Sequence, residues 1–184
     1  IEGGQPEHTG NKTECALLQY ARDCGVEYPS VRETTEVAHM LTFSSAKKRM
    51  SVVVKTSLSS CRIYTKGATE VVLGLCEKTL GVDGSTSELS KIRRNVIGLQ
   101  VIEKYASQGY RTLCLAYRDV NVPAEEISKW SDEDLEKELT CIAIVGIEDP
   151  VRPEVPGAIV DCANAGIQVR MVTGDNITTA RSIA

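Results

Sequence analysis

Alternating apolar and polar residues mark three strands in the first third of the chain. The pattern predicts strands over residues 36–43, 49–58 and 61–66. Residues 49–58 are rich in β-branched side chains, and the Ser59-Ser60 pair supplies a turn into the third strand. Because the connections between these strands are short, we expect an antiparallel meander.

Helical spacing and capping residues predict the elements on either side of the meander. Thr13 can cap a first helix that Gly25 ends, and Gly67 can open a second one. Apolar residues three and four positions apart, from Ile92 to Ile102, indicate a long amphipathic helix. The pattern predicts helices over residues 14–24, 68–78, 88–108 and 122–139, and further strands over 111–117 and 140–147.

A different pattern begins at residues 148–153, where two prolines and three charges predict a stiff, extended connector. Pro153 is well placed to start a helix, and a strand over 167–172 is expected to lead through Thr173-Gly174-Asp175-Asn176 into another helix. This α-β-α order is typical of a parallel α/β unit. The expected parts are residues 1–148, a hinge over 149–153, and a second unit over 154–184.

Composition argues against several functional classes. The chain has 184 residues and a net charge of −4, which disfavours non-specific nucleic-acid binding. It has seven cysteines without a C-x-x-C pair and two histidines, so we expect reduced, mostly buried thiols and no zinc site. The longest apolar run, residues 141–147, is far shorter than a membrane span requires.

Candidate chemistry gathers near the ends of the predicted strands. Phe43 is the one phenylalanine of the chain and lies close to Lys47 and Lys48, while Lys66-Gly67 ends the third strand. An aromatic face can stack on a base, lysines can neutralise phosphates, and glycine lets a ligand approach the backbone closely. The sequence holds neither G-x-x-x-x-G-K-[ST] nor G-x-G-x-x-G. A nucleotide would therefore be held by stacking and point charges rather than by a glycine-rich loop.

Five motifs occur in a characteristic order along the chain. They are Gly10-Asn-Lys-Thr-Glu-Cys-Ala-Leu17, residues 43–51, Lys66-Gly-Ala-Thr-Glu70, Asp149-Pro-Val-Arg-Pro153 and Thr173-Gly-Asp-Asn176. Together they resemble the cytoplasmic nucleotide-binding domain of the P-type ATPases, and the resemblance covers nearly the whole chain. The stretches 145–155 and 169–176 are most similar to those of plasma-membrane-type calcium pumps.

The resemblance implies an α/β (α+β) fold, with a mostly antiparallel sheet flanked by helices. Residues 1–148 would be the nucleotide-binding domain, truncated at its N-terminus. After the hinge, residues 154–184 would start the C-terminal half of a parallel, Rossmann-like phosphorylation domain. The implied partners are ATP and the phosphorylation, actuator and transmembrane domains of the same pump, at the cytoplasmic face of a membrane.

The resemblance also implies ATP with Mg²⁺ as the ligand, and Ca²⁺ as an ion that the parent pump transports but that is not bound here. The family nucleophile is an aspartate in a D-K-T-G-T-L-T motif, and a distal G-D-G-x-N-D motif holds Mg²⁺. Neither string occurs in this sequence. We therefore expect the chain to hold ATP without transferring its phosphoryl group.

By the same resemblance, Phe43 stacks on adenine, Glu14 faces the adenine amino group, and Lys66 lies at the bottom of the ATP pocket beside Gly67. Each assignment has an alternative. Phe43 could be a core residue at a strand end. Glu14 could instead be a first-turn residue that complements the helix dipole, and Lys66 could be a solvated lysine at a strand end.

Lys48 and Arg111 match family residues near the phosphates. Residues 47–49 could instead form a solvated turn, and the offset of the family arginine varies among subfamilies. Thr173, Gly174 and Asp175 match the phosphorylation domain, where the aspartate approaches the nucleotide or Mg²⁺ on domain closure. The alternative is an ordinary turn in which Asp175 caps the last helix.

Two rival functions remain open. The parent could be a pump for H⁺, Na⁺/K⁺ or lipid, because the ion ligands lie in membrane helices outside this chain. The chain could also be a regulatory or protein-interaction domain with secondary ATP binding, and the acidic segment 120–139 around Trp130 would then be the contact patch.

Overall fold

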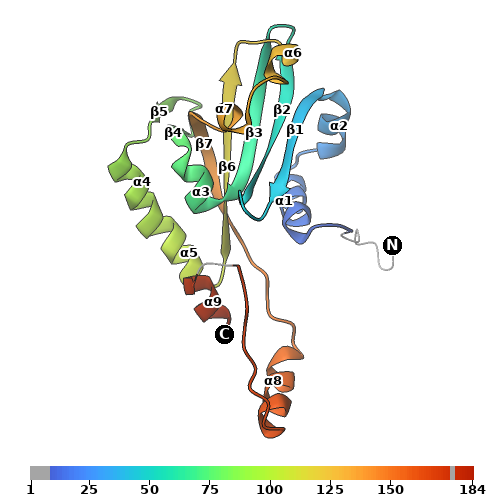
Figure 1. The fold of residues 1–184 in the computed structure, drawn as a ribbon, viewed down its shortest axis with the longest axis vertical. Coiled ribbons are helices and arrows are strands. Elements are labelled where there is room, and N and C mark those ends of the chain that lie inside the picture. Colours follow the sequence, from blue (N-terminus) through green and yellow to red (C-terminus); the bar gives the residue numbers. More distant parts are fainter. Residues whose placement is uncertain (1–8, 175–176) are drawn as a thin grey trace.

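A seven-stranded sheet in the order β1-β2-β3-β6-β7-β4-β5 forms the body of the computed structural model, which describes residues 9–174 and 177–184 (Figure 1). β4 and β7 run parallel, and the other neighbouring strands run antiparallel. The strands are β1 Val37–Ser44, β2 Arg49–Ser57, β3 Ser60–Ala68, β4 Cys76–Leu80, β5 Thr86–Glu88, β6 Arg111–Val120 and β7 Leu139–Ile147. The expected mixed α/β fold with a mostly antiparallel sheet is therefore confirmed.

The predicted meander is formed by β1, β2 and β3, and its register decides which residues share a face. Met50 of β2 lies opposite Lys66 of β3, and Arg49 lies opposite Gly67. β3 alternates strictly, because Ile63 and Thr65 are buried while Tyr64 is exposed. Lys66 therefore projects from the more open face of the sheet.

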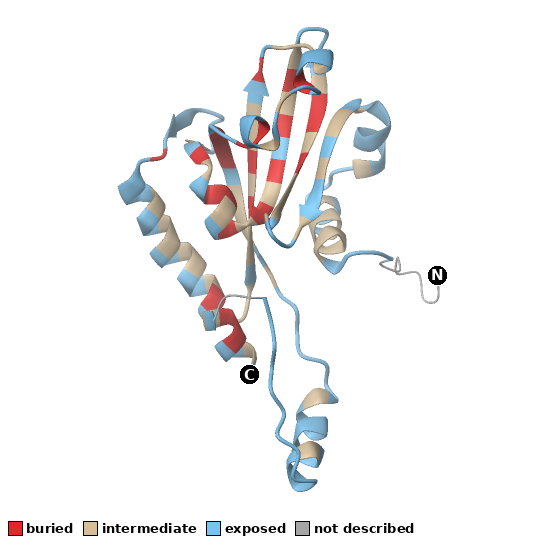
Figure 2. Cartoon of the chain, in the orientation of Figure 1, coloured by how far each residue is buried: buried red, intermediate tan, exposed pale blue. Residues whose placement is uncertain are grey.

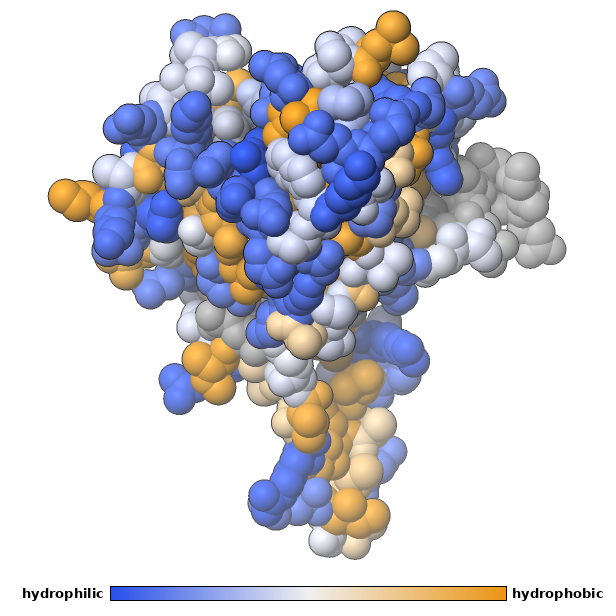
Figure 3. Space-filling model, turned by 45° about the horizontal axis from the view of Figure 1, so that its top comes forward, coloured by the Kyte–Doolittle hydropathy of each residue, from blue (hydrophilic) through white to orange (hydrophobic). Residues whose placement is uncertain are grey.

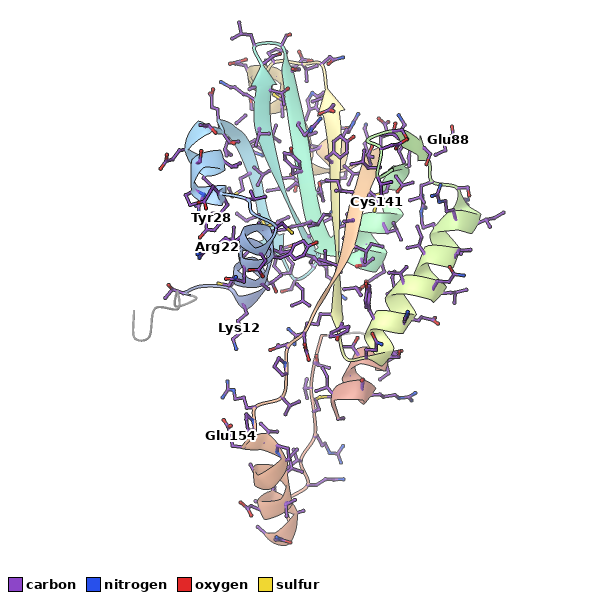
Figure 4. The ribbon with its side chains drawn as sticks, turned by 180° about the vertical axis from the view of Figure 1, so that it is seen from behind. Lys12, Arg22, Tyr28, Glu88, Cys141 and Glu154 are labelled. Atoms are coloured by element: carbon purple, nitrogen blue, oxygen red, sulfur yellow. The ribbon has the colours of Figure 1, made fainter. Side chains whose placement is uncertain are left out.

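Helices lie beside the sheet and at both of its ends. The helical segments are α1 Lys12–Asp23, α2 Tyr28–Thr34, α3 Thr69–Gly74, α4 Lys91–Ile97, the π-helical turn η1 Gly98–Ile102, α5 Glu103–Ser107, α6 Ala124–Ile127, α7 Asp132–Leu135, α8 Val155–Asn164 and α9 Ile177–Ile183. Seen from behind, α1 and α2, which carry Lys12, Arg22 and Tyr28, lie at the β1 side of the sheet (Figure 4).

The predicted helix over residues 68–78 is wrong in its second half. α3 ends at Gly74, and Cys76–Leu80 forms β4, which pairs with β7 on one side and β5 on the other. These pairings join residues far apart in sequence, so they override local helix propensity. For the same reason the long helix begins at Lys91, capped by Ser90, and not at Glu88, which pairs within β5.

Two buried clusters stabilise the sheet. One packs α3 against β4, β6 and β7, and the other joins β2, β3 and β6 to α6 and α7. Ile127 and Leu135 are completely buried in the second cluster, so the polar segment 122–139 is anchored in the core by two apolar side chains. All seven cysteines are free, and four of them, including Cys141 on β7, are buried.

The C-terminal part differs from the expected parallel unit. α8 extends away from the sheet at the end of two extended connectors, and its residues are exposed or half-buried (Figure 2). Residues 167–172 are extended but form no strand, because no strand lies beside them within the described residues to supply backbone partners. Figure 3 shows apolar side chains gathered on this projecting piece.

α9 lies apart from α8 and packs against the sheet body. Thr179 and Ala180 are buried, and Ser182 Oγ donates to the backbone carbonyl of Ser107 at 3.1 Å. Thr179 Oγ1 approaches the carbonyl of Tyr110 at 3.4 Å. These contacts place α9 beside the start of β6.

Candidate functional site

The main candidate site is a cavity of about 430 Å³ between α1, the end of β1, the end of β3 and the start of β6. This volume falls in the range of small-molecule sites. Its lining residues are Asn11, Thr13, Glu14, Phe43, Ser45, Lys48, Met50, Lys66, Gly67, Ala68, Arg111, Thr112, Leu113, Ile147 and Gly174. Seven of the nine residues that the sequence singled out therefore line one cavity.

Phe43 lies near the end of β1 and is 60% exposed. A phenylalanine that served the core would be covered by other apolar side chains, so the core alternative does not fit this position. Phe43 instead offers an uncovered aromatic surface at the cavity, together with Met50 from the neighbouring strand.

Glu14 and Lys66 form an ion pair that joins α1 to β3 beside the cavity. Glu14 lies in the first turn of α1, which begins after Asn11, whose side chain accepts a hydrogen bond from Thr13 N at 2.9 Å. Asn11, and not Thr13 as predicted, is therefore the capping residue. Lys66 is 24% exposed, so it is neither fully solvated nor withdrawn from a ligand in the cavity.

The turn over residues 44–49 brings Lys48 to the cavity. Lys48 has a φ of 51°, which is uncommon for a residue with a side chain. Its amide donates to the carbonyl of Ser44 at 2.7 Å, and its own carbonyl accepts from Ala68 N at 2.9 Å. Within the described residues, the Lys48 ammonium pairs with no carboxylate, so it is available to an anion.

Gly67 allows β2 and β3 to come unusually close at this turn. A Cβ atom placed on Gly67 would lie 2.4 Å from the carbonyl oxygen of Lys48 and 2.6 Å from Cβ of Arg49. Both distances are shorter than van der Waals contact, so only glycine fits here. The missing Cβ thus makes room for the neighbouring strand, and Gly67 also lines the cavity, where it was predicted to let a ligand approach.

A smaller cavity of about 100 Å³ continues from the main one. The two share Lys48, Ala68, Arg111, Thr112 and Gly174, and Glu70 of α3 and Thr179 of α9 line only the smaller one. Arg111 Nη1 lies 3.4 Å from Oδ2 of Asp149, so this arginine also ties the connector after β7 to the start of β6.

Thr173 and Asp175 are the other two predicted site residues. Thr173 does not line either cavity, although it directly precedes Gly174, which lines both. Asp175 lies outside the described residues. The apolar floor formed by Leu113 and Ile147 was not predicted, because these residues are ordinary strand residues in sequence and become neighbours of the cavity only when β6 pairs with β7.

Ionic contacts tie the same turn to the segment after α6. Lys47 pairs with Asp132 at the start of α7. Their hydrogen bond holds the pKa of the Asp132 carboxyl below its usual value and raises the pKa of Lys47. Residues 47–49 therefore form more than a solvated turn, since two of their three side chains have carboxylate partners.

Neither a metal centre nor a membrane span is found among the described residues. No group of three or more histidine, cysteine or acidic side chains is arranged to hold a metal ion within residues 9–174 and 177–184. In the same part of the chain, no helix has both the length and the apolar character needed to cross a bilayer.

Comparison with known proteins identifies the family. Residues 1–154 match the sequence family described as P-type ATPase, cytoplasmic domain N. The chain is 54% identical over its full length to plasma membrane calcium-transporting ATPase 1 of Gallus gallus and 53% identical to the Homo sapiens protein of that name. It is 46% identical to plasma membrane calcium-transporting ATPase 4 of Homo sapiens.

In each case the chain spans about 15% of the relative's length. The match covers the sheet and the cavity together, because both lie almost entirely within residues 1–154. The chain therefore belongs to the P-type ATPase family, in which it corresponds to cytoplasmic domain N.

Proposed function

We propose that this chain is the ATP-binding domain of a calcium-transporting P-type ATPase, and that in the whole pump it presents the γ-phosphate of ATP to an aspartate outside this chain. The observation that carries the proposal is the 430 Å³ cavity, which gathers an exposed aromatic ring, a carboxylate and basic side chains from separate segments. The relatives are named as plasma membrane calcium-transporting ATPases, which supports Ca²⁺ as the cargo and the cytoplasmic face of the plasma membrane as the location.

The adenine is proposed to stack on Phe43, with its amino group directed at Glu14. Base–aromatic stacking contributes about 1–3 kcal/mol per base. A carboxylate accepts a hydrogen bond from the adenine amino group, whereas guanine presents a carbonyl at the same position. The pair therefore supplies both affinity and a preference for adenine.

The phosphates are proposed to extend toward Lys48, Arg111 and Gly174, which line both cavities. In the absence of ligand, Lys66 is held by Glu14. Lys66 pairs with Oε2 of Glu14, so the second carboxylate oxygen can accept from the adenine amino group, and the lysine ammonium, which has three donors, can also contact a phosphate oxygen. The Glu14–Lys66 pair can therefore contact both the base and a phosphate.

Phosphoryl transfer is proposed to need groups outside this chain. Mg²⁺ neutralises phosphate charge, and an in-line nucleophile accepts the phosphoryl group. The described acidic residues form no metal-binding group of their own, so the ion would arrive with ATP. Asp175 is proposed to approach the nucleotide when the domains close, and the nucleophilic aspartate would come from another part of the pump.

The division of the chain is also proposed in these terms. Residues 1–148 would be the nucleotide-binding domain, 149–153 the hinge, and 154–184 the start of the C-terminal half of the phosphorylation domain. The exposed apolar side chains of residues 167–172 support this division, because a strand of a parallel sheet is normally covered on both faces. The remaining domains of the pump would provide that cover.

The rival reading of segment 120–139 as a contact patch has less support. Ile127 and Leu135 are completely buried, and Trp130 packs against the same core cluster. The apolar residues of the segment are therefore used in folding rather than offered to a partner.

Titration of the ¹⁵N-labelled 184-residue chain with ATP tests the proposal. We expect chemical-shift changes at Phe43, Lys48 and Lys66, with weaker changes on adding GTP. Residues 57–60, at the far end of the β2–β3 hairpin, provide an internal control that should not shift. Shifts confined to residues 120–139, or no shifts at millimolar ATP, would contradict the proposed function.

A further inference from the structure

Glu136 is the most deeply buried acidic side chain near the site, yet it does not line the cavity. The residue is 2% exposed and follows α7. Its carboxylate accepts from Ser51 Oγ at 2.7 Å and from Arg49 Nε at 2.8 Å. Because the carboxylate can only accept, Ser51 uses its proton there, so Thr65 Oγ1 donates to Ser51 at 2.9 Å. Side chains of β2 and β3 thus form a buried chain of hydrogen bonds that ends on this one carboxylate.

The backbone around Glu136 is also held by contacts that the Glu136 side chain does not make. The preceding residue, Leu135, is completely buried, and so is Leu139 three residues later. From β6, Arg118 holds the segment on both sides, with Nη1 donating to the carbonyl of Asp134 at 2.8 Å and Nη2 pairing with Glu138 at 2.9 Å. The carboxylate is therefore a fixed point against which other groups are oriented.

Arg49 links the Glu136 carboxylate to the turn that holds Lys48. Its side chain is 16% exposed, and its guanidinium contacts Glu136 through Nε and Nη2, both at 2.8 Å. The third nitrogen, Nη1, donates to the backbone carbonyl of Lys47 at 3.3 Å. One planar group therefore spans a buried carboxylate and the peptide bond that precedes Lys48.

Lys48 depends on such support because its backbone is in the left-handed region, with a φ of 51°. For a residue with a Cβ atom this conformation costs of order 1 kcal/mol or more and persists only where the surroundings impose it. The tight approach of Gly67 to Lys48 and Arg49 imposes it from the β3 side. The Glu136–Arg49 pair imposes it from the other.

We propose that Glu136 is a positioning residue for nucleotide binding, which acts through Arg49 and the Lys47 carbonyl to aim Lys48 at the phosphates. This inference rests on the proposed function, since it takes the phosphates of ATP as the partner of Lys48. It assigns to the segment after α7 a role in phosphate binding, although no residue of that segment lines the cavity.

Comparison of ATP with adenosine in the 184-residue chain separates positioning from simple stability. Glu136→Gln retains an acceptor for Ser51 but removes the charge that orients Arg49. We expect the Kd for ATP to rise about fivefold, which corresponds to about 1 kcal/mol, while that for adenosine changes less than twofold. Ser51→Ala is the matched control, because it removes a hydrogen bond to the same carboxylate and leaves Arg49 paired. It should lower the melting temperature without changing the ATP-to-adenosine ratio.

Two further variants make the test independent of folding losses in Glu136→Gln. Arg49→Lys keeps a positive charge near Glu136, but a single ammonium cannot reproduce the fork, so we expect the same change in ratio. In a Lys48→Ala background, Glu136→Gln should have no additional effect on ATP binding. Both substitutions remove the same contribution, which is the contact of the Lys48 ammonium with the phosphates. An unchanged ratio in both single variants, or fully additive losses with Lys48→Ala, would overturn the inference.

Hydrogen exchange of the Lys48 amide tests the turn without nucleotide. This amide donates to the Ser44 carbonyl at 2.7 Å, and we expect it to exchange faster in Glu136→Gln than in the wild type and in Ser51→Ala. A wild-type chain that binds neither ATP nor adenosine would overturn the proposed function, whereas an unchanged Lys48 exchange rate would overturn the positioning role itself.

Discussion

Replacement of Gly67 by alanine is the sharpest single test of how the site is built. The added Cβ would lie 2.4 Å from the Lys48 carbonyl oxygen and 2.6 and 2.7 Å from Cβ and Cα of Arg49. Ordinary contacts between such atoms are about 3.5 Å or longer, so the strands must separate by nearly 1 Å. These three atoms are a backbone oxygen, a Cα and a Cβ, so none of them can move aside by a change of rotamer.

Overpacking of this kind costs typically about 1–3 kcal/mol of folding free energy. For a domain of this size, each kcal/mol lowers the melting temperature by about 2–4 °C, so we expect a loss of about 2–12 °C. Separation of the strands also breaks the hydrogen bond from Ala68 N to the Lys48 carbonyl, which is 2.9 Å long in the structure. ATP affinity should therefore fall more than adenosine affinity.

The assay is thermal unfolding followed by circular dichroism, together with calorimetric titration of both ligands. Gly74→Ala is the matched control, because a Cβ there meets nothing within 4 Å and the residue lies in the last turn of α3. It should leave both melting temperature and affinity nearly unchanged. If Gly67→Ala melts like the wild type and binds ATP equally well, the close approach of the strands at Gly67 does not shape the site.

The remaining predictions concern the ligand contacts. Phe43→Ala should raise the Kd for ATP about five- to 140-fold with little change in melting temperature, since the ring is 60% exposed, and unchanged affinity in a folded variant would remove Phe43 from the site. Lys66→Ala should lower the affinity for ATP more than the affinity for adenosine, and the loss of ATP affinity should shrink as salt is added. Equal losses for the two ligands would place Lys66 at the adenine. Glu14→Gln should reduce the preference for ATP over GTP in competition titrations, and a variant that still excludes GTP would locate selectivity elsewhere. Incubation of the chain with Mg²⁺ and γ-labelled ATP should give no acid-stable phosphoprotein, and a labelled band would show that it holds a nucleophile of its own.

The strands could be predicted from sequence wherever pairing partners are adjacent in the chain. β1, β2 and β3 form a local meander, so alternation and the Ser59-Ser60 turn were sufficient. β4 was not predictable in this way, because Cys76–Leu80 becomes a strand only by pairing with β7, more than sixty residues later. Over residues 167–172 a strand was predicted but is not formed, because an apolar run forms a strand only where a partner strand is present.

The candidate site was predicted mainly by resemblance, and its physical basis became visible only in three dimensions. No local rule joins Glu14 to Lys66 or Arg49 to Glu136, because each pair links distant segments. Gly67 was singled out as a point of ligand approach, and the structure adds a separate reason for glycine there, since its missing Cβ makes room for β2. The role of Glu136 had no sequence signal, because it lies in an acidic stretch where most carboxylates are solvated.

The electrostatics of the cavity also explain why overall charge says little about the ligand. The chain carries a net charge of −4, which by itself would repel ATP. Among the described residues, however, Lys48, Lys66 and Arg111 line the cavity with Glu14, and even with Asp149 paired to Arg111 the basic side chains there outnumber the acidic ones. At physiological ionic strength, charges more than about 8 Å apart are largely screened in solvent, so the lining residues outweigh the distant acidic ones. The Glu14–Lys66 pair reduces this local charge. A polyphosphate without a base gains neither stacking on Phe43 nor a hydrogen bond to Glu14, and it should therefore bind more weakly than ATP even though it carries comparable charge.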